Sequence, residues 1–258
     1  MKKLLFLTSA FALTAALGNA HAVSSGFTGS LGLGYSQTAG KTHSVATYDT
    51  VEGGTPVVND AVTANPTSAS VGGELTVGYR RVLNNNFVLS AALGAAYSGE
   101  AADQTFSVKD AEETVTTHRT VEGRLTHGIS GIFKLKAGMV FNNFEVYLGA
   151  AALVTPFDFK MKEIADSDGT DANETYNTYA NKKSSWGIAP LAGVAYHLND
   201  KINVFAEFSQ TFYRTKVPIA AAGDTGLEAA GDGNPGYSIA GTSKPVITRV
   251  LVGVQVTV

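Results

Sequence analysis

The chain has 258 residues, of which 44% are hydrophobic and 16% are charged, and its formal net charge is −3. It contains no cysteine, so the sequence excludes a disulfide framework, a thiolate zinc cluster and a cysteine nucleophile. No basic cluster of the kind that binds nucleic acid is present, and no segment after the N-terminus approaches the roughly 18 continuous apolar residues of a helical membrane span.

The N-terminus has the pattern of a secretory signal peptide. Lys2 and Lys3 precede the apolar run 4–17, and Ala20-His21-Ala22 supplies the small residues of a cleavage site. An anchoring helix is the alternative, but the run is shorter than the roughly 20 residues needed to span a bilayer. We therefore predict a signal peptide over residues 1–22, cleaved after Ala22, and a mature domain over residues 23–258.

The first half of the mature chain contains three strand-like segments, at 27–37, 70–82 and 87–98. In each, apolar and small or polar residues alternate, which is the period of a β-strand. The third is the clearest: Phe87, Leu89 and Leu93 share one face, whereas Ser90 and Gly94 lie on the other.

Five further segments follow, at 123–140 and 144–155, in the two alternating runs between 191 and 214, and at 246–258. In the segment 123–140 we place Leu125, His127, Ile129 and Phe133 on the apolar face. In the run that starts at Ile202, one face is apolar and the other carries Glu207, which is costly in a dry core unless a cation meets it.

The connections alternate between short and long. Short turns are expected at 83–86, 141–143 and 198–201, and long external loops at about 38–69, 99–122, 156–184 and 217–244. This asymmetry is typical of outer-membrane barrels, and strands one and eight must pair because an open edge is untenable in hydrocarbon. The predicted fold class is an all-β, transmembrane, antiparallel up-and-down β-barrel of eight strands. A secreted β-sandwich or lipocalin-like barrel is the alternative, and it would bury the stripes at 87–97 and 246–258.

The alternation also assigns residues to the two faces of the barrel. On the outer face, rings at both ends of the apolar band predict an aromatic girdle of Phe27, Tyr35, Tyr79, Phe87, Tyr97, Trp186, Tyr196 and Phe212. On the inner face, we predict a lumenal network of opposite charges formed by Glu74, Arg80, Lys134, Lys136, Glu145, Glu207 and Arg249.

The hairpin 193–208, Gly-Val-Ala-Tyr-His-Leu-Asn-Asp-Lys-Ile-Asn-Val-Phe-Ala-Glu-Phe, resembles the penultimate hairpin of the OmpA, OmpX and opacity-protein-like outer-membrane barrels. The resemblance implies the outer membrane of a Gram-negative envelope, contact with its lipid and lipopolysaccharide, and insertion by the barrel-assembly machinery. Two features depart from the family: the chain ends in Val258 instead of Phe or Trp, and no peptidoglycan-binding domain follows the barrel.

These patterns favour a structural or surface-interaction protein, concerned with envelope integrity or adhesion, whose loops could meet an extracellular or host ligand. A narrow porin-like channel is the alternative. An outer-membrane enzyme is a further alternative. Its sole candidate catalytic cluster is His118 with Glu112, Glu113 and Ser130, and nothing in the sequence fixes the geometry of these residues. The acidic segment 166–171 resembles a calcium loop but lacks the downstream bidentate Glu, so we expect no metal and no cofactor.

Overall fold

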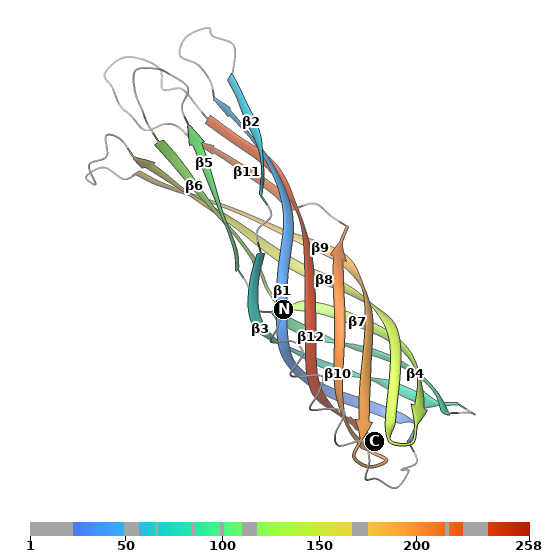
Figure 1. The fold of residues 1–258 in the computed structure, drawn as a ribbon. Coiled ribbons are helices and arrows are strands. Elements are labelled where there is room, and N and C mark those ends of the chain that lie inside the picture. Colours follow the sequence, from blue (N-terminus) through green and yellow to red (C-terminus); the bar gives the residue numbers. More distant parts are fainter. Residues whose placement is uncertain are drawn as a thin grey trace, which may run out of the picture.

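The computed structural model describes residues 23–48, 57–64, 67–83, 86–98, 101–109, 118–166, 175–214, 217–223 and 237–258. These ranges form twelve β-strands in one sheet (Figure 1). Within them, no helix is long and apolar enough to cross a membrane. The predicted signal peptide lies outside the described residues.

Eight of the strands close into a ring. In the order of the ring they are β1 (Gly26–Tyr48), β3 (Thr67–Val82), β4 (Phe87–Ser98), β7 (Ser130–Phe141), β8 (Phe144–Asp166), β9 (Thr175–His197), β10 (Ile202–Tyr213) and β12 (Tyr237–Thr257). Every neighbouring pair is antiparallel, and β12 pairs with β1 over its whole length, with Gly253 opposite Gly32. The ring has no free edge, and the predicted fold class is confirmed.

Three short turns lie together at one end of the barrel, which we call the turn end. The turn between β7 and β8 is closed by the pair Phe141 and Phe144, and Asn142 adopts the left-handed conformation with φ 55°. Between β9 and β10, the Asn199 side-chain oxygen accepts hydrogen bonds from the backbone N–H groups of Lys201 and Ile202, at 2.9 and 2.8 Å. Asparagine suits both positions because it tolerates positive φ and caps its own turn.

At the opposite end, strands continue through much of the sequence that was predicted to form long loops. β1, β8, β9 and β12 extend beyond the ring, and four further strands join them: β2 (Val57–Ala64), β5 (Ala101–Lys109), β6 (His118–His127) and β11 (Val217–Gly223). We call this end the extension, and Figure 1 shows it projecting from the barrel. In β8 the alternation is reversed here: Phe157 and Phe159 are buried, whereas Lys160 is exposed, and the segment still pairs as a strand.

The extension consists of two four-stranded groups. One is β2-β1-β12-β11 and the other is β5-β6-β8-β9. Among the described residues, no ladder joins β9 to β11 or β2 to β5. The hydrogen-bonded ladder of the wall is therefore interrupted where β9 and β10 stop pairing, and we call this interruption the fork.

The two faces of the ring differ in polarity in the predicted sense. Leu89 and Val252 on the outer face expose 42% and 37% of their surface, whereas Glu207 on the inner face exposes 2%. Other outward apolar residues are Leu31, Leu33, Leu75, Val77, Leu93, Leu135, Leu148 and Val254. A continuous apolar band of this extent is unfavourable in water and favourable in lipid, so the barrel is a transmembrane one. The alternative of a sandwich with buried stripes is wrong.

One predicted strand is interrupted, and this changes the direction of two side chains. Gly128 and Ile129 separate β6 from β7, whereas the sequence predicted one continuous strand over 123–140. Because the interruption shifts the alternation by one residue, Leu125 and His127 are buried, and the prediction that they face lipid is wrong. Ile129 and Phe133 lie on the outer face as predicted.

Candidate functional site

The candidate site is the lumen, and its middle is occupied by four charged side chains. We call Glu74, Lys134, Lys136 and Glu207 the central cluster. The ammonium of Lys134 on β7 contacts the carboxylates of both Glu74 on β3 and Glu207 on β10, the latter at 2.5 Å from Nζ to Oε1. Lys136 Nζ lies 2.6 Å from the other oxygen, Oε2, of Glu207. These contacts join three strands across the interior of the ring, and the cluster is charge-balanced.

Aromatic side chains enclose the central cluster. The hydroxyl of Tyr147 donates a hydrogen bond to Glu207 Oε2 at 3.3 Å. The Lys136 ammonium lies 4.7 Å from the centre of the Tyr147 ring and 5.6 Å from that of Phe205, so both rings face a cation. Glycine admits these rings: a Cβ at Gly193 would lie 2.4 Å from Tyr147 Cζ.

A second group of charges closes the lumen at the turn end. Arg80 on β3 and Glu145 on β8 form an ion pair at 2.5 Å between Nη2 and Oε2. His197, the last residue of β9, places Nε2 at 3.2 Å from the same oxygen and is buried. From the sequence, His197 is expected at a turn and outside the lumenal network. The alternation of the strand could have indicated this position: His197 lies two residues after Ala195, which faces inward, and residues two apart in a strand share a face.

The end of the lumen next to the extension is filled by neutral groups. The hydroxyls of Ser130, Thr155 and Tyr213 are joined in a chain by two hydrogen bonds of 2.7 Å. The Tyr213 ring packs edge-on against Phe157 with centroids 4.9 Å apart. Apolar residues fill much of the remaining interior; they are Ile132, Ala151, Leu153, Ala189, Leu191 and Ala195. Side chains therefore occupy the lumen at every level from the turns to the extension.

The structure brings six of the seven predicted lumenal charges into the two clusters just described. The seventh, Arg249 on β12, is buried as well. It lines a narrow gap together with Glu74, close to the central cluster. The alternation of residues along each strand predicts that these side chains lie on the inner face. Which of them form ion pairs depends on how far the strands are offset along the barrel axis, and the sequence does not show that offset.

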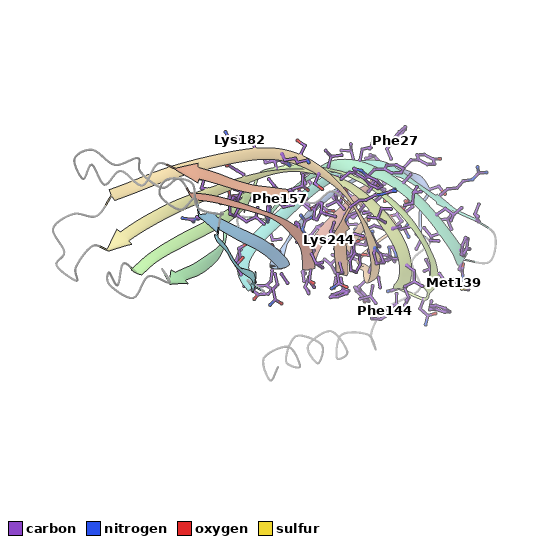
Figure 2. The ribbon with its side chains drawn as sticks, turned by 90° about the horizontal axis from the view of Figure 1, so that it is seen from above. Phe27, Met139, Phe144, Phe157, Lys182 and Lys244 are labelled. Carbon is purple, nitrogen blue, oxygen red and sulfur yellow. The ribbon has the colours of Figure 1, made fainter. Side chains whose placement is uncertain are left out.

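The residues predicted to form an aromatic girdle all lie on the outer face. Phe27, Tyr35, Tyr79, Phe87, Tyr97, Trp186 and Phe212 are exposed, and Tyr196 is half-buried. Two pairs touch edge-on at the turn end, Phe27 with Tyr79 at 5.4 Å and Tyr196 with Phe144 at 5.0 Å between centroids. Figure 2 shows Phe27 and Met139 at this end of the barrel and Lys182 toward the extension.

The structure describes only some of the candidate catalytic and metal-binding residues. Glu112 and Glu113 lie outside the described residues, as does all of the segment 166–171 except Asp166. The backbone of His118 belongs to β6, and Ser130 is buried and bonded to Thr155. In the part of the chain that the structure describes, no group of three or more His, Asp or Glu side chains is placed to hold a metal ion.

No family model and no curated protein matches this chain. Solved structures similar to it include the outer membrane protease OmpT of Escherichia coli, with 9% identity, a TM-score of 0.43, and coverage of 92% of this chain and 99% of that one. The outer membrane protein OprG of Pseudomonas aeruginosa has 13% identity, a TM-score of 0.45 and the same coverage. Ail, the attachment invasion locus protein of Yersinia pestis, has 13% identity and a TM-score of 0.27, covering 86% and 99%.

The identities are low and the TM-scores are below 0.5, so the fold of this chain is established by its own strand pairing. The ring closes between β1 and β12, apolar side chains face outward, and charged side chains are paired inside. The chain is a transmembrane, eight-stranded β-barrel of the outer-membrane type with a lumen filled by side chains.

Proposed function

We propose that this protein is a non-conducting barrel of a Gram-negative outer membrane that acts as a structural or surface-interaction protein. The observation that carries the proposal is the pair of contacts made by Lys134, which reach Glu74 and Glu207 from across the lumen. An eight-stranded ring is about wide enough for its interior to be filled by side chains, and here charges and rings take up that space.

The energetics of the central cluster argue against conduction. An ion that passed through would have to separate Lys134 from a carboxylate, and removing one partner of a buried pair costs roughly 3–5 kcal/mol. Lys136 would be uncovered as well, because it shares Glu207 and lies against two aromatic rings. We therefore infer that the barrel is a rigid support and that its function lies on its outer surfaces.

The surface available for partners is the extension. Eight strands, β1, β2, β5, β6, β8, β9, β11 and β12, carry the chain beyond the ring, and the segments that connect them are the usual place for binding on a rigid scaffold. We propose that an extracellular or host ligand is met there. We also propose that the barrel-assembly machinery inserts the chain, and that outer-membrane lipid and lipopolysaccharide surround it.

Conductance recordings test the filled lumen directly. The purified mature chain, refolded and reconstituted in planar bilayers, is expected to show no current steps above the bare bilayer. The variant K134M alters the central cluster, and K160M removes the same charge from an exposed position on β8. Steps in the wild-type protein that K134M changes and K160M does not would establish the channel instead.

A deletion strain separates the surface role from transport. Its adhesion and envelope integrity are expected to fall, with uptake of small solutes unchanged. Complementation with the charge-balanced double variant K134M/E74Q should restore adhesion and integrity as fully as the wild type, because it alters only the lumen. Reduced solute uptake in the deletion strain, altered again by the double variant, would show that transport is the function.

The remote alternative of an outer-membrane enzyme has its own test. OmpT is a protease, but the fold it shares with this chain does not carry its activity. We propose that purified, refolded protein hydrolyses neither peptides nor lipids. An activity that is lost in H118A would refute this part of the proposal.

A further inference from the structure

The fork in the barrel wall opens a cleft on the outer face. The ladder between β9 and β10 ends with Phe212 opposite Ile188 and Tyr213 opposite Gly187. After Arg214 the chain continues as β11, which pairs with β12. The last hydrogen bond between the two strands lies at Trp186, whose carbonyl oxygen accepts a 3.0 Å hydrogen bond from the Arg214 N–H, and the described residues form no ladder between β9 and β11.

The cleft has a volume of about 290 Å³ and two chemically distinct parts. Its apolar wall is formed by Trp186, Ile188, Phe212 and Val246, and its basic rim by Arg214 and Lys244. Both basic residues are exposed, and the Arg214 guanidinium carbon lies 5.2 Å from the centre of the Trp186 ring. Among the described residues that line the cleft there is no carboxylate, so its described lining carries an excess of positive charge.

The position of the cleft relative to the membrane indicates its occupant. Trp186, Ile188 and Phe212 are exposed by 43%, 53% and 48% and belong to the lipid-facing surface, at the girdle nearest the extension. The basic rim therefore lies where headgroups meet acyl chains. Positively charged side chains at this depth attract anionic headgroups, and the apolar wall below them suits a chain of methylenes.

We infer that this cleft, the girdle cleft, binds the phosphorylated headgroup of an anionic lipid in the leaflet next to the extension. The phosphate lies between Arg214 and Lys244, and an acyl chain runs along Ile188 and Phe212. Arginine can bind phosphate through two parallel N–H donors, and here the guanidinium lies over the indole ring of Trp186. A volume of 290 Å³ is enough for a headgroup, and it is open along its side to the membrane.

The tryptophan provides the assay, because the chain contains only one and it lines the cleft. The mature protein is refolded into phosphatidylcholine vesicles that contain phosphatidylglycerol, with bromine on the acyl chains of one lipid at a time. Brominated chains quench tryptophan on contact. We expect brominated phosphatidylglycerol to quench Trp186 several-fold more effectively than brominated phosphatidylcholine at equal mole fraction.

Charge variants decide where the preference resides. In R214Q/K244Q the preference should disappear, since each basic side chain near the surface is worth on the order of fivefold in lipid binding. The control R81Q/K201Q removes two exposed bases at the turn end and should leave the preference intact. Quenching is expressed relative to each variant's unquenched emission, which removes any direct effect of Arg214 on the indole.

Three results would overturn the inference. The first is equal quenching by the two lipids in the wild-type protein. The second is a preference that persists in R214Q/K244Q, which would assign it to the general charge of the surface. The third is loss of the preference for phosphatidylglycerol when millimolar inorganic phosphate is added at constant ionic strength. This result would show that the cleft is a site for free anions and not for a lipid. If R214Q/K244Q fails the heat-modifiability test for folding, K244Q alone should show a partial loss of the preference.

Discussion

Replacing Lys134 with methionine should destabilise the barrel more than any other single removal of a positive charge. The wild-type central cluster has two ammonium groups and two carboxylates, and Lys134 contacts both acids. In K134M, Glu207 keeps Lys136, but Glu74 loses its contact and the cluster carries an excess negative charge. A buried carboxylate left without its cation costs roughly 3–5 kcal/mol, and the free energy of unfolding should fall by about that amount.

A second substitution tests whether the loss is electrostatic. K134M/E74Q restores one cation to one anion by keeping the pair formed by Lys136 and Glu207. Because a neutral amide is much cheaper to bury than an unpaired carboxylate, most of the lost stability should return. The control K160M, on an exposed part of β8, should stay within about 0.5 kcal/mol of the wild type.

Unfolding by guanidinium in vesicles measures these differences, with heat-modifiable migration on gels as a second reading. The slope with denaturant should be the same for all four proteins, so that the midpoints report stability. If K134M matched K160M, the central cluster would not be the buried, coupled group described above. If the double variant were no more stable than K134M, the cost would be steric and not due to charge.

Three further predictions rest on single positions. G193A should lower the free energy of unfolding by roughly 1–3 kcal/mol because its Cβ would meet the Tyr147 ring, whereas G131A, with nothing within 4 Å, should be close to neutral; the same unfolding assay compares them. L93R places a charge in the middle of the lipid-facing band and should cost about 2–4 kcal/mol in vesicles, and wild-type stability would contradict the membrane placement. Sequencing the N-terminus of the protein from the envelope should show cleavage after Ala22, and an intact leader would refute the signal peptide.

The faces of the barrel strands could be predicted because the period of a strand is two residues and lipid demands apolar side chains on every second one. Glu207 and Lys134 could also be placed at similar heights by counting from the short turns. What could not be counted is the relative stagger of strands that are not neighbours, on which the contacts of Lys134 with both β3 and β10 depend.

The errors have equally physical causes. Gly128 and Ile129 carry no proline or polar cluster to mark an interruption, yet two residues outside the strands are enough to reverse the phase of Leu125 and His127. The extension was predicted as loops because alternation was used as the sign of a strand. Apolar side chains face outward only where a strand meets lipid. Beyond the bilayer the pattern in β8 is reversed, with Phe157 and Phe159 buried and Lys160 exposed, while the hydrogen-bonded ladder continues.

This distinction also explains why the two proposals concern outer surfaces. Within the ring, each charged side chain of the central cluster forms an ion pair with another member of the cluster, so a ligand would have to break one of these pairs to bind there. At the girdle next to the extension the ladder between β9 and β10 ends while β11 continues to pair with β12, and Arg214 and Lys244 lie above an apolar wall. Side chains that pair with each other fill the lumen, and at the fork in the wall the described lining presents two basic side chains, Arg214 and Lys244, to the membrane.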